Sequence, residues 1–302
     1  MDYTLQPDEL VSDGIKRIVD GKAQRAIDQI ENDTDCHETV HEVRKRCKEI
    51  RAAIRLVRPV LPTYKQENVH YRDAARRISD IRDAHAAIET FDEQLKPAVK
   101  TRDVLNETHL TEIRATLTDR RDTMAAEQGV EHRLTEVQAD IREGQKRVAD
   151  LPIATEGYDA VAGGLRKSYK RARNRMQEAY ADPTFERFHE WRKRIKYHRY
   201  HSRLLRRVWV GPMKCRRAEL KELSDIIGYE NDLAEFAAVM HDEELFTPES
   251  REALSGVITA KRSEFHRQGR PLGERLFAET PDELVARIGA YWEATHEYDP
   301  TP

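Results

Sequence analysis

The chain has 302 residues, of which 35% are charged and 38% hydrophobic, with a formal net charge of −3 and a mean hydropathy of −0.81. This length allows one large domain or two of about 150 residues, and the near-neutral balance excludes a protein that is basic over its whole surface. No apolar run approaches the roughly 20 residues of a membrane span, and the N-terminus does not resemble a signal peptide. Three cysteines without CxxC spacing favour reduced thiols in the cytoplasm: Cys36, Cys47 and Cys215.

The apolar residues of the first half recur at helical spacing, and no segment has the alternation of a strand. Asp35 and Glu38 form the pattern of a capping box, which predicts the start of a helix there. We expect that helix to end at Arg58 and Pro59. The helix expected over residues 66–94 should stop at Lys96 and Pro97. The other helices expected in this half span residues 8–31, 66–94, 102–127 and 130–149.

The second half repeats this plan after a boundary at Leu151 to Gly164. Asp182 and Pro183 predict the start of a second basic helix, and Gly211 and Pro212 its end. Residues 248–268 and 281–297 supply the last helices. The expected fold is therefore all-α, with two bundles of about four helices each, related by a pseudo-twofold axis. The halves are residues 1–150 and 151–302, which together form one domain.

An internal repeat supports this division. The sequence from His41 to Arg58 and the sequence from His189 to Arg206 both match H-E-x-R-K-R-x-K-x-x-R-x-x-x-R-L-x-R without a gap, at an offset of 148 residues. Repeats of this kind determine the architecture and should be recognised first.

On a helix, each copy carries a cationic stripe about 100° wide beside an apolar stripe. Like charges three or four residues apart cost about 0.2–0.5 kcal/mol per pair. A solvated charged face remains the simpler interpretation, but its repetition favours an anionic partner. The residues predicted to bind it on these helices are His41, Arg44, Lys45, Lys48, Arg51, Arg55, His189, Arg192, Lys193, Lys196, Arg199 and Arg203.

Further basic residues share helical faces elsewhere and are predicted to form the walls of the same site. They are Arg72, Arg76, Arg166, Tyr169, Lys170, Arg173, Lys214, Arg217 and Lys221. Two acidic residues, Asp83 and Asp232, end the related motifs ISDIRD and IGYEND. Each is predicted to orient an arginine through a bidentate pair.

Metal and catalytic sites are less well supported. His37 with His41, and His198 with His201, have helical spacing, but neither pair brings a carboxylate or cysteine at a recognised zinc spacing. The chain has no P-loop, GxGxxG, HExxH or GxSxG motif. We therefore expect a binding protein without a metal or cofactor and without a catalytic constellation.

The duplicated H-E-x-R-K-R-x-K helix, followed in each half by ISDIRD or IGYEND, resembles the CHAD family, the conserved histidine α-helical domain. Ser79 stands where the second motif has Gly228. The resemblance implies binding of inorganic polyphosphate along a basic groove between the two bundles, in a stand-alone protein associated with polyphosphate granules.

Two other functions remain open at this stage. RNA binding could use base stacking on Trp191, Tyr197 or Tyr200. A phosphoanhydride hydrolase would need carboxylates that hold magnesium, for which Asp83 and Asp232 are the candidates.

Overall fold

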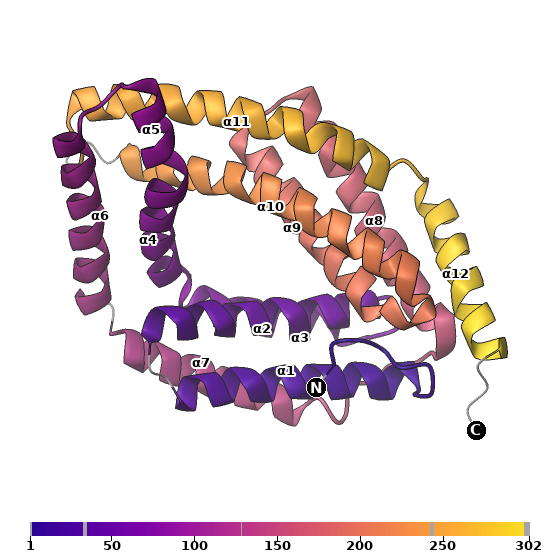
Figure 1. The fold of residues 1–302 in the computed structure, drawn as a ribbon. Coiled ribbons are helices and arrows are strands. Elements are labelled where there is room, and N and C mark those ends of the chain that lie inside the picture. The colour runs from indigo at the N-terminus through magenta and orange to yellow at the C-terminus, as the bar shows by residue number, and fades with distance from the viewer. Residues whose placement is uncertain (1, 33–34, 128, 242–244, 299–302) are drawn as a thin grey trace.

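The computed structural model describes residues 2–32, 35–127, 129–241 and 245–298, and within these ranges every regular element is a helix (Figure 1). The all-α prediction is confirmed. The first half contains α1 (Val11–Glu31), α2 (Cys36–Leu56), α3 (Tyr64–Arg76), α4 (Ser79–Thr90), the π-helical turn η1 (Phe91–Leu95), α5 (Lys96–Arg102), α6 (Glu107–Glu127) and α7 (Val130–Lys146). The second half contains α8 (Gly157–Ala181), α9 (Phe185–Leu204), the 3₁₀ turn η2 (Arg206–Val208), α10 (Val210–Met240), α11 (Pro248–Leu276) and α12 (Pro281–Tyr298).

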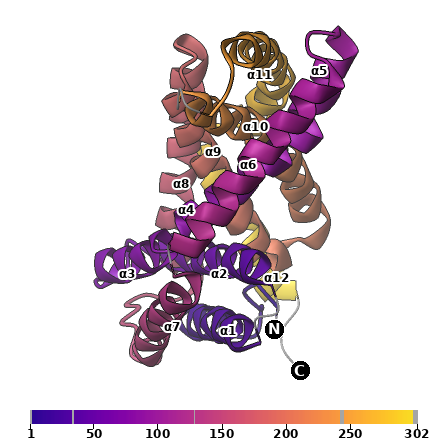
Figure 2. The same cartoon turned by 90° about the vertical axis from the view of Figure 1, so that its left-hand side faces the viewer.

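Four helices of the first half form a closed bundle. Helix α2 packs on α1 and α3, and α7 packs on both of these from the other side (Figures 1 and 2). The buried stripe of α2 includes Val43, Ile50 and Ile54, as its apolar spacing requires. The helix start at Asp35 is confirmed, because the Asp35 side chain accepts hydrogen bonds from the backbone N–H groups of His37 and Glu38.

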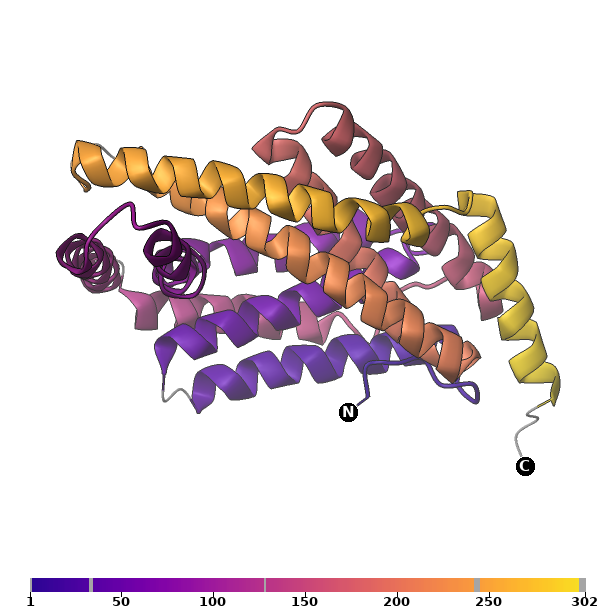
Figure 3. The same cartoon turned by 45° about the horizontal axis from the view of Figure 1, so that its top comes forward.

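In the second half, α9 packs between α8 and α10, α11 packs on α10, and α12 covers α8 (Figure 3). Tyr180 of α8 donates a hydrogen bond of 2.9 Å to the His266 carbonyl of α11, so these two helices are linked directly. One large hydrophobic cluster unites α1, α2, α3 and α7 with α8 and α9. A second cluster joins η1 and α6 to the C-terminal part of α10 and to α11. Each cluster therefore draws on residues from both halves.

The helix expected over residues 66–94 is divided, and this part of the prediction was wrong. Helix α3 ends at Arg76, and α4 begins at Ser79, whose hydroxyl donates to the Arg76 carbonyl at 2.9 Å. Ile78 between them is fully buried, and Arg77 pairs with Asp140 of α7 at 3.1 Å. The break lets α3 stay in the bundle while α4 turns away from it to pack against α6 and α10 (Figure 2).

Two proline signals were also misread. Pro97 does not stop a helix, because it occupies the first turn of α5, where its missing N–H costs nothing. The second basic helix ends at Leu204, earlier than expected, and Gly211 and Pro212 lie in the first turn of α10. The predicted start of α9 at Asp182 and Pro183 was also wrong, because the N-cap is Thr184, whose side chain accepts from the Arg187 N–H.

None of the described helices is both long enough and apolar enough to cross a membrane.

Candidate functional site

Helices α2 and α9, which carry the repeated basic sequence, cross each other directly. The buried His201 ring of α9 lies 3.1 Å from the Ala52 carbonyl of α2 at this crossing. Burial, together with Arg192 and Lys48 nearby, holds the pKa of Lys196 well below its ordinary value. The fold thus brings cations from both copies of the repeat to one place.

On one side of the crossing, the IGYEND motif of α10 supports the start of α9. Arg192 lies 3.6 Å from Asp232, and its guanidinium lies over Gly228, where a Cβ atom would come within 3.2 Å of it. His189 hydrogen-bonds to the Asn231 side chain. Burial raises the pKa of Asp232, although Arg192 opposes the shift. Asp232 therefore faces an arginine, as predicted, but the described contact is an ion pair at 3.6 Å and not the predicted bidentate hydrogen-bonded pair. The side chain of Asp83 lies outside the described residues.

A second side, which we call the Glu49 flank, contains a buried carboxylate among its cations. It consists of Tyr3, Lys22, Arg46, Glu49 and Arg203. The Glu49 carboxylate is almost fully buried and lies 2.7 Å from Lys22, 3.0 Å from Arg46 and 3.3 Å from Arg203. Three cations therefore share one carboxylate on this flank.

The opposite side, which we call the Tyr197 flank, has a different chemistry. At the repeat offset of 148 residues, Tyr197 stands where the first copy has Glu49. The Arg55 guanidinium lies 4.1 Å from the centre of the Tyr197 ring and 5.8 Å from that of Tyr64. The side-chain oxygen of Asn68 (Oδ1) accepts hydrogen bonds from Arg55 at 2.8 Å and from Arg51 at 3.2 Å. The flank comprises Arg51, Arg55, Arg58, Tyr64, Asn68, Lys167, Arg171, Arg194 and Tyr197.

Several cations of the Tyr197 flank were missed by the sequence analysis. Lys167 and Arg171 come from α8. The charges of Arg58 and Arg171, together with burial, lower the pKa of Lys167. Arg171 adds to the burial that lowers the pKa of Arg58 and of Arg194. Helix α8 approaches the end of α2 so closely that a Cβ atom on Gly164 would lie 1.7 Å from the Leu56 carbonyl oxygen. A glycine one helical turn before the basic run was the available signal for this contact.

The other face of α8, which the sequence analysis favoured, points away from the crossing. Arg166 forms a bidentate pair with Asp282 of α12, with its longer contact at 3.0 Å. Tyr169 is fully buried and donates to the Glu279 carbonyl at 3.0 Å. Arg173 donates to the Phe277 carbonyl at 3.1 Å, and Lys170 is exposed. Arg166, Tyr169 and Arg173 thus hold α8 against α12 and the α11–α12 connection.

The remaining predicted residues divide between the crossing and the periphery. Arg217 of α10 lies in the field of Arg203 and Arg199, beyond the Glu49 flank. Arg72 and Arg76 both pair with Asp73, at 2.7 and 3.9 Å. Lys221 pairs with Asp225 at 2.6 Å, and Lys214 is exposed. The half-exposed Lys45 and Lys193 each pair with a glutamate on their own helix, and His41 is exposed.

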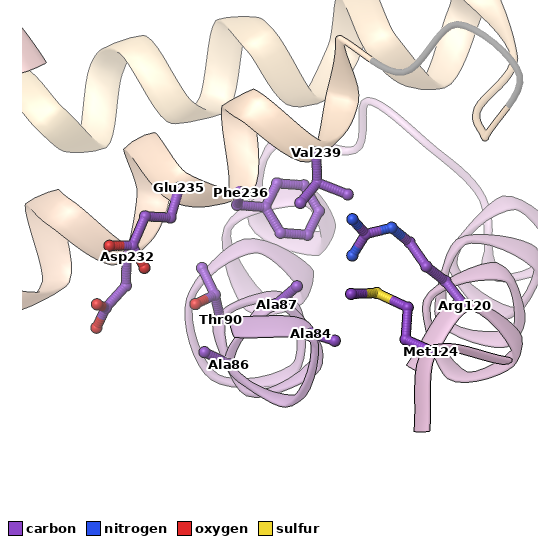
Figure 4. Close-up of a pocket in the computed structure, with 10 residues that line it drawn as sticks. All are labelled: Ala84, Ala86, Ala87, Thr90, Arg120, Met124, Asp232, Glu235, Phe236 and Val239. Atoms are coloured by element: carbon purple, nitrogen blue, oxygen red, sulfur yellow. The ribbon is translucent and has the colours of Figure 1, made fainter. Parts of the chain in front are cut away.

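A cavity of about 180 Å³ lies between α4, α6 and α10, apart from the crossing (Figure 4). Its walls are mostly apolar, with Phe236 and Val239 on α10 and Met124 on α6. Asp232 and Glu235 stand on one side, and the Arg120 guanidinium points toward Phe236 and Val239 from the other. Asp232, which pairs with Arg192, therefore also lines this cavity.

The described residues contain no group of three or more His, Cys, Asp or Glu side chains that could hold a metal ion. Burial lowers the pKa of His201 to about 3 and that of His198 well below its ordinary value, so both rings are neutral core residues. Trp191 is also fully buried. The arrangement at the crossing is thus one of cations and hydrogen-bond donors, suited to binding an anion.

Comparisons with known proteins agree with this description. The sequence model of the CHAD domain matches residues 21–241. Among solved structures, PptA from Streptomyces chartreusis is similar over 90% of this chain and 100% of its own, with a TM-score of 0.58 and 14% sequence identity, which shows a shared fold. No curated protein sequence matches the chain.

Proposed function

Because the chain belongs to the CHAD domain family, we propose that it binds inorganic polyphosphate on the surface where α2 crosses α9. The polymer carries a negative charge at every unit and offers only charge and oxygen atoms for recognition. Arginine binds phosphate oxygens in a bidentate fashion and lysine acts as a point charge. A crossing of two cationic helices supplies both along a line.

The observation that carries this proposal is the placement of Lys48 near Lys196. Burial and the neighbouring cations lower the pKa of Lys196, so the unliganded protein pays electrostatic free energy to keep these groups together. Asp232 offsets only part of that cost at Lys196, and a bound anion would offset more of it. Each hydrogen bond to a charged group contributes about 1.5–3 kcal/mol, so a modest number of contacts binds the polymer tightly.

The proposed contacts run along both helices and include one residue of α10. They are His41, Arg44, Lys45, Lys48, Arg51, Arg55, His189, Arg192, Lys193, Lys196, Arg199, Arg203 and Arg217. In this proposal the two halves act as one domain, and binding to polyphosphate granules follows from binding the polymer.

The double variant Arg51→Glu/Arg199→Glu tests the proposal, because it reverses one charge on each helix. We expect it to lose binding of long-chain polyphosphate while its helical circular dichroism stays that of the wild type. Titrations at several salt concentrations, with single-stranded RNA of equal total charge in parallel, separate the rival function. Polyphosphate should bind more tightly than RNA at every salt concentration, and equal binding of the two polymers would contradict a dedicated site.

A further inference from the structure

The two flanks of the crossing have equivalent basic residues but a different residue between them. Arg46 and Arg203 flank Glu49 on one side, and their counterparts at the offset of 148, Arg194 and Arg55, flank Tyr197 on the other. The Glu49 carboxylate is held 3.0 and 3.3 Å from its two arginines. Tyr197 offers a ring and a hydroxyl in its place, so the Tyr197 flank lacks the carboxylate that its counterpart has.

Additional cations collect on the Tyr197 flank without acidic partners. No carboxylate of the described residues lies within 4.0 Å of Arg58, Lys167 or Arg171, and Arg194 pairs only with Glu190, at 3.0 Å. Arg58 is 9% exposed and Arg55 is 6% exposed. The Nε atoms of both, and one terminal nitrogen of Arg58, have no hydrogen-bond partner. Buried guanidinium donors without acceptors are costly and rare in folded proteins.

The ionisation of neighbouring groups agrees with an excess of positive charge. Burial would raise the pKa of Tyr197, but Arg55, Arg51, Arg194 and Lys193 outweigh it and lower the pKa. Burial, with Arg55 and Arg171 nearby, lowers the pKa of Arg58 to about 10. A cation whose proton is made less stable by its surroundings gains from any anion that enters.

We propose that the Tyr197 flank is a discrete binding site for a compact oligophosphate group, which supplies the negative charge that Glu49 supplies on the opposite flank. Four side chains form it: Arg55, Arg58, Arg171 and Arg194, with Lys167 at its edge. Several arginines close enough to act on the pKa of Arg58 and Arg194 suit an anion with several charges and oxygen atoms, as a di- or triphosphate has and a simple carboxylate does not. The site stands on its own contacts, and only the long-chain arm of its test rests on the proposed function.

The oligophosphate can be free in solution or can be a segment of the longer polymer. A free triphosphate should occupy the site at one equivalent per chain. If the polymer uses the same site, tripolyphosphate should compete with long-chain polyphosphate, and the same variants should weaken both. The opposite flank offers no equivalent site, because Glu49 already occupies it.

Tyr197→Glu tests the site by restoring the carboxylate of the other repeat. In calorimetric titrations with tripolyphosphate, we expect at least a tenfold loss of affinity for this variant. Tyr197→Phe keeps the ring beneath Arg55 and should stay within about threefold of the wild type. Without ligand, the Tyr197→Glu protein should melt at or above the wild-type temperature, and tripolyphosphate should no longer raise it. A folded Tyr197→Glu protein that binds tripolyphosphate within twofold of the wild type would overturn the proposal.

Two further variants keep the test decisive. Arg171 is exposed on α8, so Arg171→Gln should fold and should lose about fivefold in tripolyphosphate affinity even if Tyr197→Glu does not fold. Arg199→Glu, on the other side of the crossing, should weaken long-chain polyphosphate and leave tripolyphosphate unchanged. Long-chain binding without any Tyr197-dependent tripolyphosphate binding would reject the site alone. Tripolyphosphate binding without long-chain binding would reject the polymer function and keep the site.

Discussion

The Glu49 flank and the Tyr197 flank show how one exchange changes the use of a repeated helix. Both flanks have arginines at equivalent positions of the repeat. On the first, Glu49 joins Lys22, Arg46 and Arg203 into a buried network that completes the core between α1, α2 and α9. On the second, the Tyr197 ring lies 4.1 Å from the Arg55 guanidinium, and among the described residues the only carboxylate paired with an arginine of the flank is Glu190, with Arg194. The comparison shows that the same repeated arginines meet a buried carboxylate on one flank and a tyrosine on the other, which is why we propose the compact anion site on the Tyr197 flank.

The largest effect should follow from removing the carboxylate charge of the Glu49 flank. Glu49→Gln leaves three cations around an uncharged group, and removing one partner from a buried ion pair costs about 3–5 kcal/mol. Burial already lowers the pKa of Lys22 despite its contact with Glu49, so the remaining charges are poorly tolerated. Urea denaturation measures the loss.

Glu190→Gln is the matched control on the other flank, where the glutamate is about one-third exposed beside Arg194. It should cost less than about 1 kcal/mol, as exposed pairs do. A Glu49→Gln protein as stable as this control would remove the distinction between the flanks.

The second prediction concerns the contact that brings α8 to the Tyr197 flank. In Gly164→Ala the new methyl group would meet the Leu56 carbonyl oxygen at 1.7 Å, so α8 must move away from α2. Overpacking of this kind costs about 1–3 kcal/mol. Tripolyphosphate affinity should fall with it, because Lys167 and Arg171 move too.

Gly256→Ala in α11 provides the comparison, because nothing lies within 4 Å of its new methyl group. It should gain up to about 1 kcal/mol from helix propensity. Thermal melts and tripolyphosphate titrations of both variants would show whether the position of α8 matters, and a Gly164→Ala protein that gains stability as Gly256→Ala does would refute the close contact.

A third, smaller effect is expected at Asn68, the neutral acceptor on the Tyr197 flank. Asn68→Asp adds a charge at the oxygen that Arg55 and Arg51 contact at 2.8 and 3.2 Å. Charge-assisted hydrogen bonds are about twice as strong as neutral ones, so the unliganded protein should gain about 1 kcal/mol. The same charge should weaken tripolyphosphate binding several-fold. Asn68→Ala should instead lose about 1 kcal/mol, and equal destabilisation by both variants would argue against an excess of positive charge here.

The sequence predicted helices α2 and α9 where their apolar residues recur at helical spacing. The stripes of α2 and α9, the Asp35 cap and the Asp232 contact follow from spacing alone. The division at Ile78 could not be predicted, because α3 and α4 have compatible helical periodicity, and only the tertiary contacts of α4 with α6 and α10 require the turn.

The face of α8 shows the same limit at the site. Its run of basic residues surrounds the helix, so periodicity could not decide between the Arg166 face and the Arg171 face. Packing decided it, through Gly164 against α2 and Tyr169 against the α11–α12 connection. The ion pairs of these cations likewise depend on acids distant in sequence, as Asp282 is from Arg166.

The smallest predicted effect is a pH dependence at the crossing, between the two flanks. Burial, Arg192, Lys48 and Arg199 lower the pKa of Lys196, and Asp232 only partly opposes them. Between this lowered pKa and the ordinary value of 10.5, the unfolded chain binds more protons at Lys196 than the folded protein, so the free energy of unfolding should rise with pH across that window.

A bound polyphosphate favours the charged lysine, so binding in this window should take up a proton and should weaken by about two- to threefold as pH rises, a change of roughly 0.4–0.7 kcal/mol. Calorimetry in two buffers with different ionisation enthalpies measures the uptake. Lys196→Gln should abolish this contribution, whereas Lys167→Gln, at the edge of the Tyr197 flank, should preserve it. Unchanged proton uptake in Lys196→Gln would mean that the group that takes up the proton lies on the Tyr197 flank and not at the crossing.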